Sequence, residues 1–87
     1  MTDATPVERV QTGVRLERRL LKVMKGVAEL HDISLGDLIE GVMLHAFEGK
    51  APFQGATLER IAGLRQVYGL DLTAADSHRL REASDDR

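Results

Sequence analysis

The chain has 87 residues, no cysteine and a formal net charge of −2; 43% of its residues are hydrophobic but only 3% are aromatic. A chain this short forms one small domain with an aliphatic core and little room for a deep catalytic cleft. Without cysteine it forms no disulfide and no thiolate metal site, and no apolar run approaches the ~20 residues of a membrane span. The first residues lack the basic and apolar segments of a signal peptide, so we expect a cytoplasmic protein.

The charge is unevenly distributed along the chain. Residues 1–25 contain six basic and three acidic side chains (+3), whereas residues 26–87 contain six basic and eleven acidic side chains (−5). Two such basic ends placed side by side would attract a polyanion such as DNA, and the acidic remainder would limit unspecific affinity.

Residues 1–7 are interpreted as a flexible N-terminal arm, and the first structured segment follows it. Val10, Thr12, Val14 and Leu16, a mostly apolar set, alternate with Gln11, Gly13 and Arg15. This alternation predicts a strand with one apolar and one polar face, because successive side chains of a strand point to opposite sides.

The apolar period then lengthens to three and four residues, which predicts two helices within residues 17–49. The first helix ends before the break at His31-Asp32-Ile33. Ser34, with Asp37 three residues later, is expected to begin the second helix, and Gly49 to end it. The residues expected on the buried side of the second helix are Leu38, Ile39, Val42, Met43, Ala46 and Phe47.

A single strand leaves backbone amides and carbonyls unpaired on both edges, so it needs a partner. The simplest partner is a second copy of the chain, with the two strands antiparallel across a two-fold axis and four helices over their apolar face.

In order and spacing, this stretch resembles the ribbon-helix-helix family of DNA-binding proteins, of the Arc and methionine-repressor type. The resemblance covers roughly 40 residues. It depends on Leu16 at the strand end, Ile33 in the turn, Ser34 as helix cap, and the apolar positions Leu20, Met24, Val27 and Ala28. It implies a mostly α fold: a ribbon-helix-helix homodimer with an intermolecular antiparallel β-ribbon, here with additional C-terminal helices.

The resemblance also implies where DNA would bind. Base edges in the major groove would be contacted by Gln11, Gly13 and Arg15; arginine pairs with guanine and glutamine with adenine, whereas Gly13 has no side chain for this. Phosphates would be contacted by Arg18 and Arg19, and by the start of the second helix at Ser34, Leu35 and Gly36.

The domain organisation that follows is an arm (1–7), a dimerisation and DNA-binding domain (8–49), a linker (50–56) and a C-terminal helical extension (57–87). In the extension, Thr57 is expected to cap a helix over Leu58–Tyr68 that Gly69 ends. Thr73, with Asp76, is expected to cap a short helix reaching about Ala83.

We therefore expect a sequence-specific DNA-binding transcriptional regulator, a repressor or an antitoxin, that inserts a dimeric β-ribbon into the major groove. The alternative is a dimeric interaction module that binds a partner protein, such as a toxin, through residues 50–83 without specific DNA binding. A second alternative is a helical-bundle monomer in which residues 8–16 join the first helix. We predict no enzyme, no catalytic residue, no metal site, no cofactor and no membrane partner, because the sequence contains no catalytic or metal-ligand motif.

Overall fold

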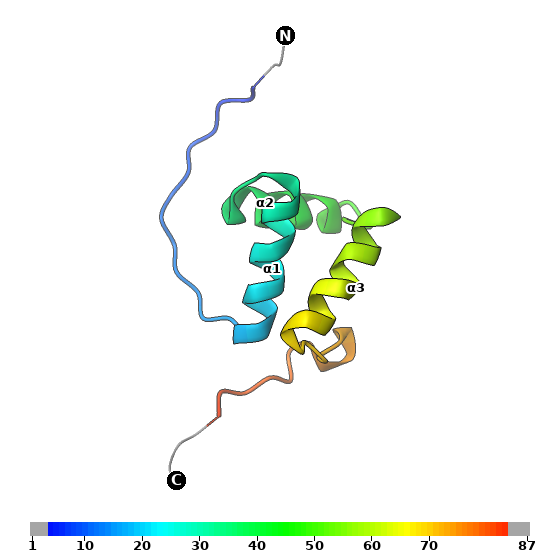
Figure 1. Ribbon diagram of the computed structural model, residues 1–87. Helices are drawn as coiled ribbons and strands as arrows, with labels where there is room; N and C mark the ends of the chain where they lie inside the picture. The colour runs from blue at the N-terminus through cyan, green and yellow to red at the C-terminus, as the bar shows by residue number, and fades with distance from the viewer. Residues whose placement is uncertain (1–3, 84–87) are drawn as a thin grey trace.

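The chain was analysed in a computed structural model that describes residues 4–83, so the first three residues of the expected arm and the last four of the expected extension lie outside the described residues. The order of elements is α1 (Arg18–His31), α2 (Leu35–Phe47), α3 (Ala56–Tyr68) and a 3₁₀ turn, η1 (Ala74–Asp76). The mostly α class is confirmed (Figure 1).

The expected strand at Val10–Leu16 is wrong, and with it the intermolecular antiparallel β-ribbon of the ribbon-helix-helix fold: no β-strand occurs within residues 4–83. Residues 4–16 form an extended segment that takes part in no backbone hydrogen bond with the described chain. A strand needs a second strand to complete its ladder, and the remainder of the described chain is helix and loop. The alternative in which residues 8–16 join the first helix is also wrong, because α1 begins only at Arg18.

Helix α1 begins and ends through local contacts. The carboxylate of Glu17 accepts a hydrogen bond from the amide of Leu20 at 2.8 Å, which satisfies one free amide of the first turn. Asp32 ends the helix in a left-handed conformation (φ 60°). The amide of Ile33 then bonds to the carbonyl of Ala28 at 3.0 Å and returns the chain toward the core.

Helix α2 begins as expected, because the Ser34 hydroxyl accepts a hydrogen bond from the amide of Asp37 at 3.1 Å. Its expected buried side is only partly covered. Leu38 is buried and Val42 is half-buried, but Met43 is 42% and Phe47 is 78% exposed. The reason is that α1 alone packs against α2, so the side of α2 that faces away from α1 meets solvent.

Helix α3 ends as expected at Gly69, which takes the left-handed conformation (φ 68°). Its start differs from the expectation: Thr57 lies inside the first turn, and the preceding cap position is Gly55, which offers no side-chain hydrogen bond. The short helix expected after Thr73 is reduced to η1. Thr73 and Asp76 do form the expected cap, with the Thr73 amide 2.8 Å from the Asp76 carboxylate, but residues 77–83 are not helical.

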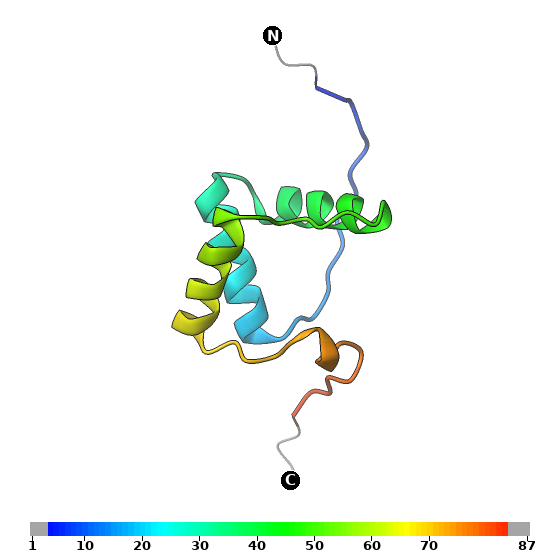
Figure 2. The same cartoon turned by 90° about the vertical axis from the view of Figure 1, so that its right-hand side faces the viewer.

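The core lies along α1, which contacts both α2 and α3. Figure 2 shows α1 and α3 side by side, with α2 crossing near one end of the pair. Gly26 allows the close approach of α3, since a Cβ there would lie 3.1 Å from two methyl carbons of Leu64. The buried residues that form the core are Val23, Val27, Ala28, Leu38 and Leu70.

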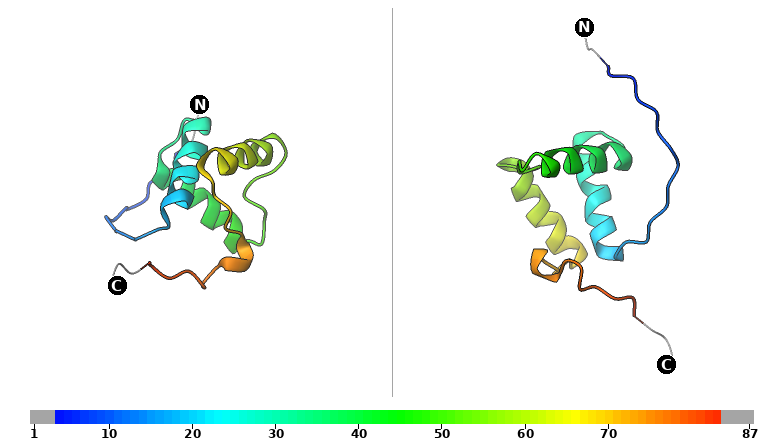
Figure 3. Two further views of the ribbon diagram at one scale, coloured as in Figure 1. Left: turned by 60° about the horizontal axis from the view of Figure 1, so that its bottom comes forward. Right: turned by 180° about the vertical axis from the view of Figure 1, so that it is seen from behind.

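The extended segment and the C-terminal segment (residues 77–83) both lie outside this three-helix packing (Figure 3). The radius of gyration is 15.1 Å. A compact chain of this length would have a radius of about 12 Å. None of the helices within residues 4–83 combines the length and the apolar character that crossing a membrane requires.

Candidate nucleic-acid interface

The extended segment carries the three residues predicted to contact bases. Gln11, Gly13 and Arg15 are all exposed. A Cβ added at Gly13 would meet no atom within 4 Å, so the backbone is open to a ligand at this point. The three residues occupy alternate positions of the segment.

Arg15 is held by the C-terminal segment. Its Nε donates to the Glu82 carboxylate at 3.2 Å, and its second guanidinium nitrogen forms an ion pair with the other carboxylate oxygen. Both side chains remain exposed, Arg15 at 83% and Glu82 at 68%. The guanidinium is therefore accessible, although an internal carboxylate already occupies its bidentate donor edge.

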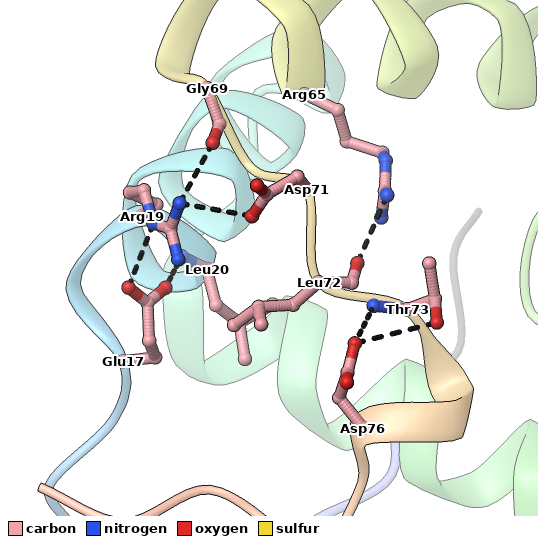
Figure 4. Close-up of polar contacts among 9 residues, drawn as sticks. All are labelled: Glu17, Arg19, Leu20, Arg65, Gly69, Asp71, Leu72, Thr73 and Asp76. Atoms are coloured by element: carbon pink, nitrogen blue, oxygen red, sulfur yellow. Dashed lines mark hydrogen bonds and ion pairs between the residues drawn. The ribbon is translucent and has the colours of Figure 1, made fainter.

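Arg19 is the most firmly placed of the predicted phosphate contacts (Figure 4). It donates to the Glu17 carboxylate at 2.9 Å, to the Gly69 carbonyl at 3.0 Å and to the Asp71 carboxylate at 3.1 Å. These contacts tie the first turn of α1 to the residues that follow α3. The hydrogen bond to Glu17, and then the charges of Glu17 and Asp71, raise the pKa of Arg19.

Glu17 belongs to the same network. The hydrogen bond from the Leu20 amide, followed by that from Arg19, holds the pKa of the Glu17 carboxyl below its ordinary value. Glu17 thus caps α1 and orients Arg19 at the same time. Arg18, by contrast, is exposed and forms no ion pair within residues 4–83.

A groove of about 870 Å³ lies between the end of the extended segment, the first turn of α1 and the C-terminal segment. Its lining includes Arg15, Arg18, Arg19 and Arg81, against Glu17 and Glu82. The remaining lining of this basic groove is apolar, and both Arg15 and Arg19 already form ion pairs. The excess of two guanidinium groups over the carboxylates gives the groove a positive charge that would attract an anion. Arg81 was not predicted, because 63 positions separate it from Arg18 in the sequence and no local pattern links the two.

The second predicted phosphate site, at the start of α2, lies elsewhere. Ser34 and Gly36 are exposed and Leu35 is half-buried in the core. One free amide of this turn is already bonded to the Ser34 hydroxyl. Arg18 begins α1, whereas Ser34 follows its other end, and a 14-residue helix is roughly 20 Å long. The structure therefore does not bring the two sets of phosphate contacts together within one chain.

Helix α1 has two further basic residues, Lys22 and Lys25. Lys22 lies over the ring of Tyr68, 5.7 Å from its centre, and so links α1 to α3. Lys25 is exposed one turn further along the helix.

No group of three or more histidine, aspartate or glutamate side chains placed to hold a metal ion occurs in the described part of the chain. Comparisons of the chain with protein-family models, with curated proteins and with solved structures found no match.

Proposed function

We propose that the protein is a sequence-specific DNA-binding regulator, a repressor or an antitoxin, that works in the cytoplasm as a homodimer. The observation that carries the proposal is the extended segment, which is solvent-exposed through residues 4–16 and leads directly into the basic groove. In place of a β-ribbon, each chain would lay this segment along a groove of the duplex as an arm.

Base recognition is assigned to the exposed residues Gln11, Gly13 and Arg15. The Arg15 guanidinium suits the two acceptors of guanine, and the Gln11 amide suits the donor and acceptor of adenine. Gly13 between them leaves room for the backbone to approach the bases, because nothing lies within 4 Å of its missing side chain. These donors and acceptors lie in the major groove, which is wide enough to admit an extended chain.

Phosphate contacts would flank the arm on two sides. Arg18 is the available guanidinium beside the segment, and Arg19 can contribute a donor while it stays bonded to Glu17. The amides of Leu35 and Gly36, with the Ser34 hydroxyl, would hold a phosphate roughly 20 Å away, about six base pairs along the duplex.

A second copy of the chain is proposed to cover the outer face of α2, defined as Ile39, Met43, Leu44 and Phe47. Their exposed fractions are 36%, 42%, 65% and 78%. The chain exposes 7612 Å², whereas a folded monomer of its mass exposes about 5,100 Å². The extended segment and the C-terminal segment, which are exposed along their whole length, contribute to this surplus of about 2,500 Å². The reason for placing a partner on α2 is therefore the exposure of its apolar side chains. A dimer formed in this way would also contain two basic grooves.

The test is a selection of bound sites from random duplex DNA, followed by titration of the selected duplex with the wild type and with Arg15→Ala. Loss of a bidentate contact to guanine should weaken binding by about 1–3 kcal/mol and relax the preference at one base pair. Arg60→Ala on α3 is the matched control, because it removes the same charge from an exposed position of a helix that packs on α1. If Arg15→Ala and the wild type bind the selected duplex with equal affinity, the proposal that the extended segment recognises bases through Arg15 is wrong.

A second candidate function is a protein-interaction module that binds a toxin-like partner through residues 50–83. It is favoured by apolar side chains that this region leaves in solvent: Leu58, Val67 and Leu80 are 51%, 74% and 52% exposed. A gel shift against the protein's own promoter separates the two functions. Its dependence on salt reports how many phosphates are neutralised, and a module of this second kind would give no specific shift.

A further inference from the structure

We propose that Glu40 and Glu82 latch the extended segment onto its own chain in the DNA-free protein, and that DNA displaces these two carboxylates when it binds. This latch rests on the proposed function, since it regulates access to the same segment. It adds a regulatory role for two acidic residues that lie outside the segment itself.

The first contact of the latch is Glu82 on Arg15. Two oxygens of the carboxylate face two nitrogens of the guanidinium, the same fork-to-fork arrangement by which arginine holds a phosphate. The residues are 67 positions apart, so the contact exists only because the C-terminal segment returns past the start of α1. While Glu82 is bound, Arg15 cannot offer both donors to a guanine or to a phosphate.

The second contact is Glu40 on Arg9. The Arg9 guanidinium donates to the two carboxylate oxygens of Glu40 in α2 at 2.8 and 2.9 Å. This hydrogen bond raises the pKa of Arg9 and lowers that of Glu40, so the pair stays charged near neutral pH. Arg9 and Arg15 lie near the two ends of the part of the segment predicted to contact bases, and no backbone hydrogen bond holds the stretch between them.

The exposure of these pairs makes the latch reversible. In each pair both side chains are exposed, at 68% and 45% for Arg9 and Glu40 and at 83% and 68% for Arg15 and Glu82. Ion pairs in such positions are weak, and salt screens them further. Duplex DNA, with its dense row of phosphates, can therefore displace them, so the latch moderates affinity and does not block binding.

The test compares binding of a random-sequence duplex by the full-length wild type, Glu82→Gln, Glu40→Gln and the double variant at low salt. We expect each single variant to bind about two- to fivefold more tightly and the double variant to multiply the two gains. The control is Glu48→Gln, which makes the same charge change at a pair with Lys50 (3.1 Å apart) that does not involve the segment. Glu48→Gln should increase the affinity for the duplex at most slightly, because it only makes the net charge of the protein less negative.

Two further measurements tie the gain to the contact. The gain of Glu82→Gln should disappear in an Arg15→Ala background, because no guanidinium is left to release. In the wild type the Arg15 Nε–H signal in an NMR spectrum should exchange with water more slowly than in Glu82→Gln, and this readout needs no DNA.

The outcomes distinguish the two proposals. If no variant binds the duplex, the proposed function fails and the latch fails with it. If the wild type binds DNA and Glu82→Gln and Glu40→Gln behave like Glu48→Gln, only the latch is overturned. Unchanged exchange of the Arg15 Nε–H in Glu82→Gln would also overturn the Glu82 half of the latch.

Discussion

Two regions of the molecule differ in how far their apolar side chains are buried: the contact between α1 and α3, and the outer face of α2 with the extended segment. On the packed side, α1 and α3 meet through Gly26 and Leu64, and Val23 and Val27 are 5% and 3% exposed. On the open side, the outer face of α2 and the extended segment leave Val10 and Phe47 79% and 78% exposed. Both sides show regular apolar spacing in the sequence. The difference teaches that such spacing identifies residues suited to burial but does not say which surface will bury them.

The largest expected effect is on the packed side. Leu38 is 7% exposed and sits between α2 and α1. Its replacement by alanine should lower the free energy of unfolding by about 2–4 kcal/mol, through lost burial and a residual cavity. Leu58→Ala, at a position that is 51% exposed on α3, is the matched control and should cost about 0.5 kcal/mol or less. Urea titrations followed by circular dichroism measure both, and equal losses would remove the contrast between the two sides.

The open side is tested by placing a charge on it. If a second copy covers the outer face of α2, Phe47→Glu should weaken self-association at least tenfold, about 1.4 kcal/mol, because a carboxylate would have to be desolvated. Val67→Glu changes an apolar residue that is 74% exposed on α3 and should leave the mass unchanged. Sedimentation equilibrium over a range of concentrations gives the result. If the wild type is monomeric at all concentrations, the proposal that a second copy covers the outer face of α2 is wrong.

A smaller effect is expected where α3 ends on the packed side. Gly69 has a φ of 68°, and the amide of Leu70 bonds to the carbonyl of Arg65 at 2.8 Å just beyond it. A side chain in this left-handed conformation should make Gly69→Ala less stable by about 1 kcal/mol. Gly63→Ala, inside the same helix with nothing within 4 Å of the new methyl group, should gain about 0.5–1 kcal/mol. Thermal unfolding of the two variants should therefore move in opposite directions.

The smallest expected effect is a dependence of the free energy of unfolding on pH, through Glu17 between the extended segment and α1. The pKa of Glu17 is lowered by the Leu20 amide and then by Arg19, so its carboxylate adds stability above the ordinary glutamate pKa of about 4.3. That contribution is lost as the pH falls through the lowered pKa of the folded state. Between about pH 6 and pH 3, Glu17→Gln should lose less stability than the wild type. The same loss in both proteins would show that Glu17 does not couple folding to pH, and Glu59→Gln serves as the charge control.

Local chemistry made part of the fold predictable. The Ser34 cap, the Gly69 terminus and the Thr73–Asp76 cap each depend on residues three or four positions apart, and the structure has all three. The strand was mispredicted because alternation describes a backbone able to pair, while pairing requires another strand. The helix expected to reach Ala83 ends after one turn, where His78 takes a positive φ of 65°.

The candidate site was less accessible to sequence reasoning. The predicted base contacts are exposed, but so are the apolar residues that alternate with them, Val10 at 79% and Val14 at 73%, and the function of these contacts stays a prediction. Arg19 was predicted to contact a DNA phosphate, yet in the structure it bonds to Gly69 and Asp71, which lie 50 and 52 positions away. The contacts of Arg15 with Glu82 and of Arg9 with Glu40 also join residues far apart in sequence, by 67 and 31 positions. No local pattern predicts contacts of this kind.

The tight fit of Gly26 against Leu64 has a consequence for how the molecule unfolds. Because α1 reaches its buried state only with α3 and Leu70 in place, neither helix has a complete hydrophobic face without the other. The two should gain and lose their protection from amide exchange together, as a single cooperative unit. Residues 56–70 are therefore expected to unfold together with α1 and are not an appendage to the first two helices.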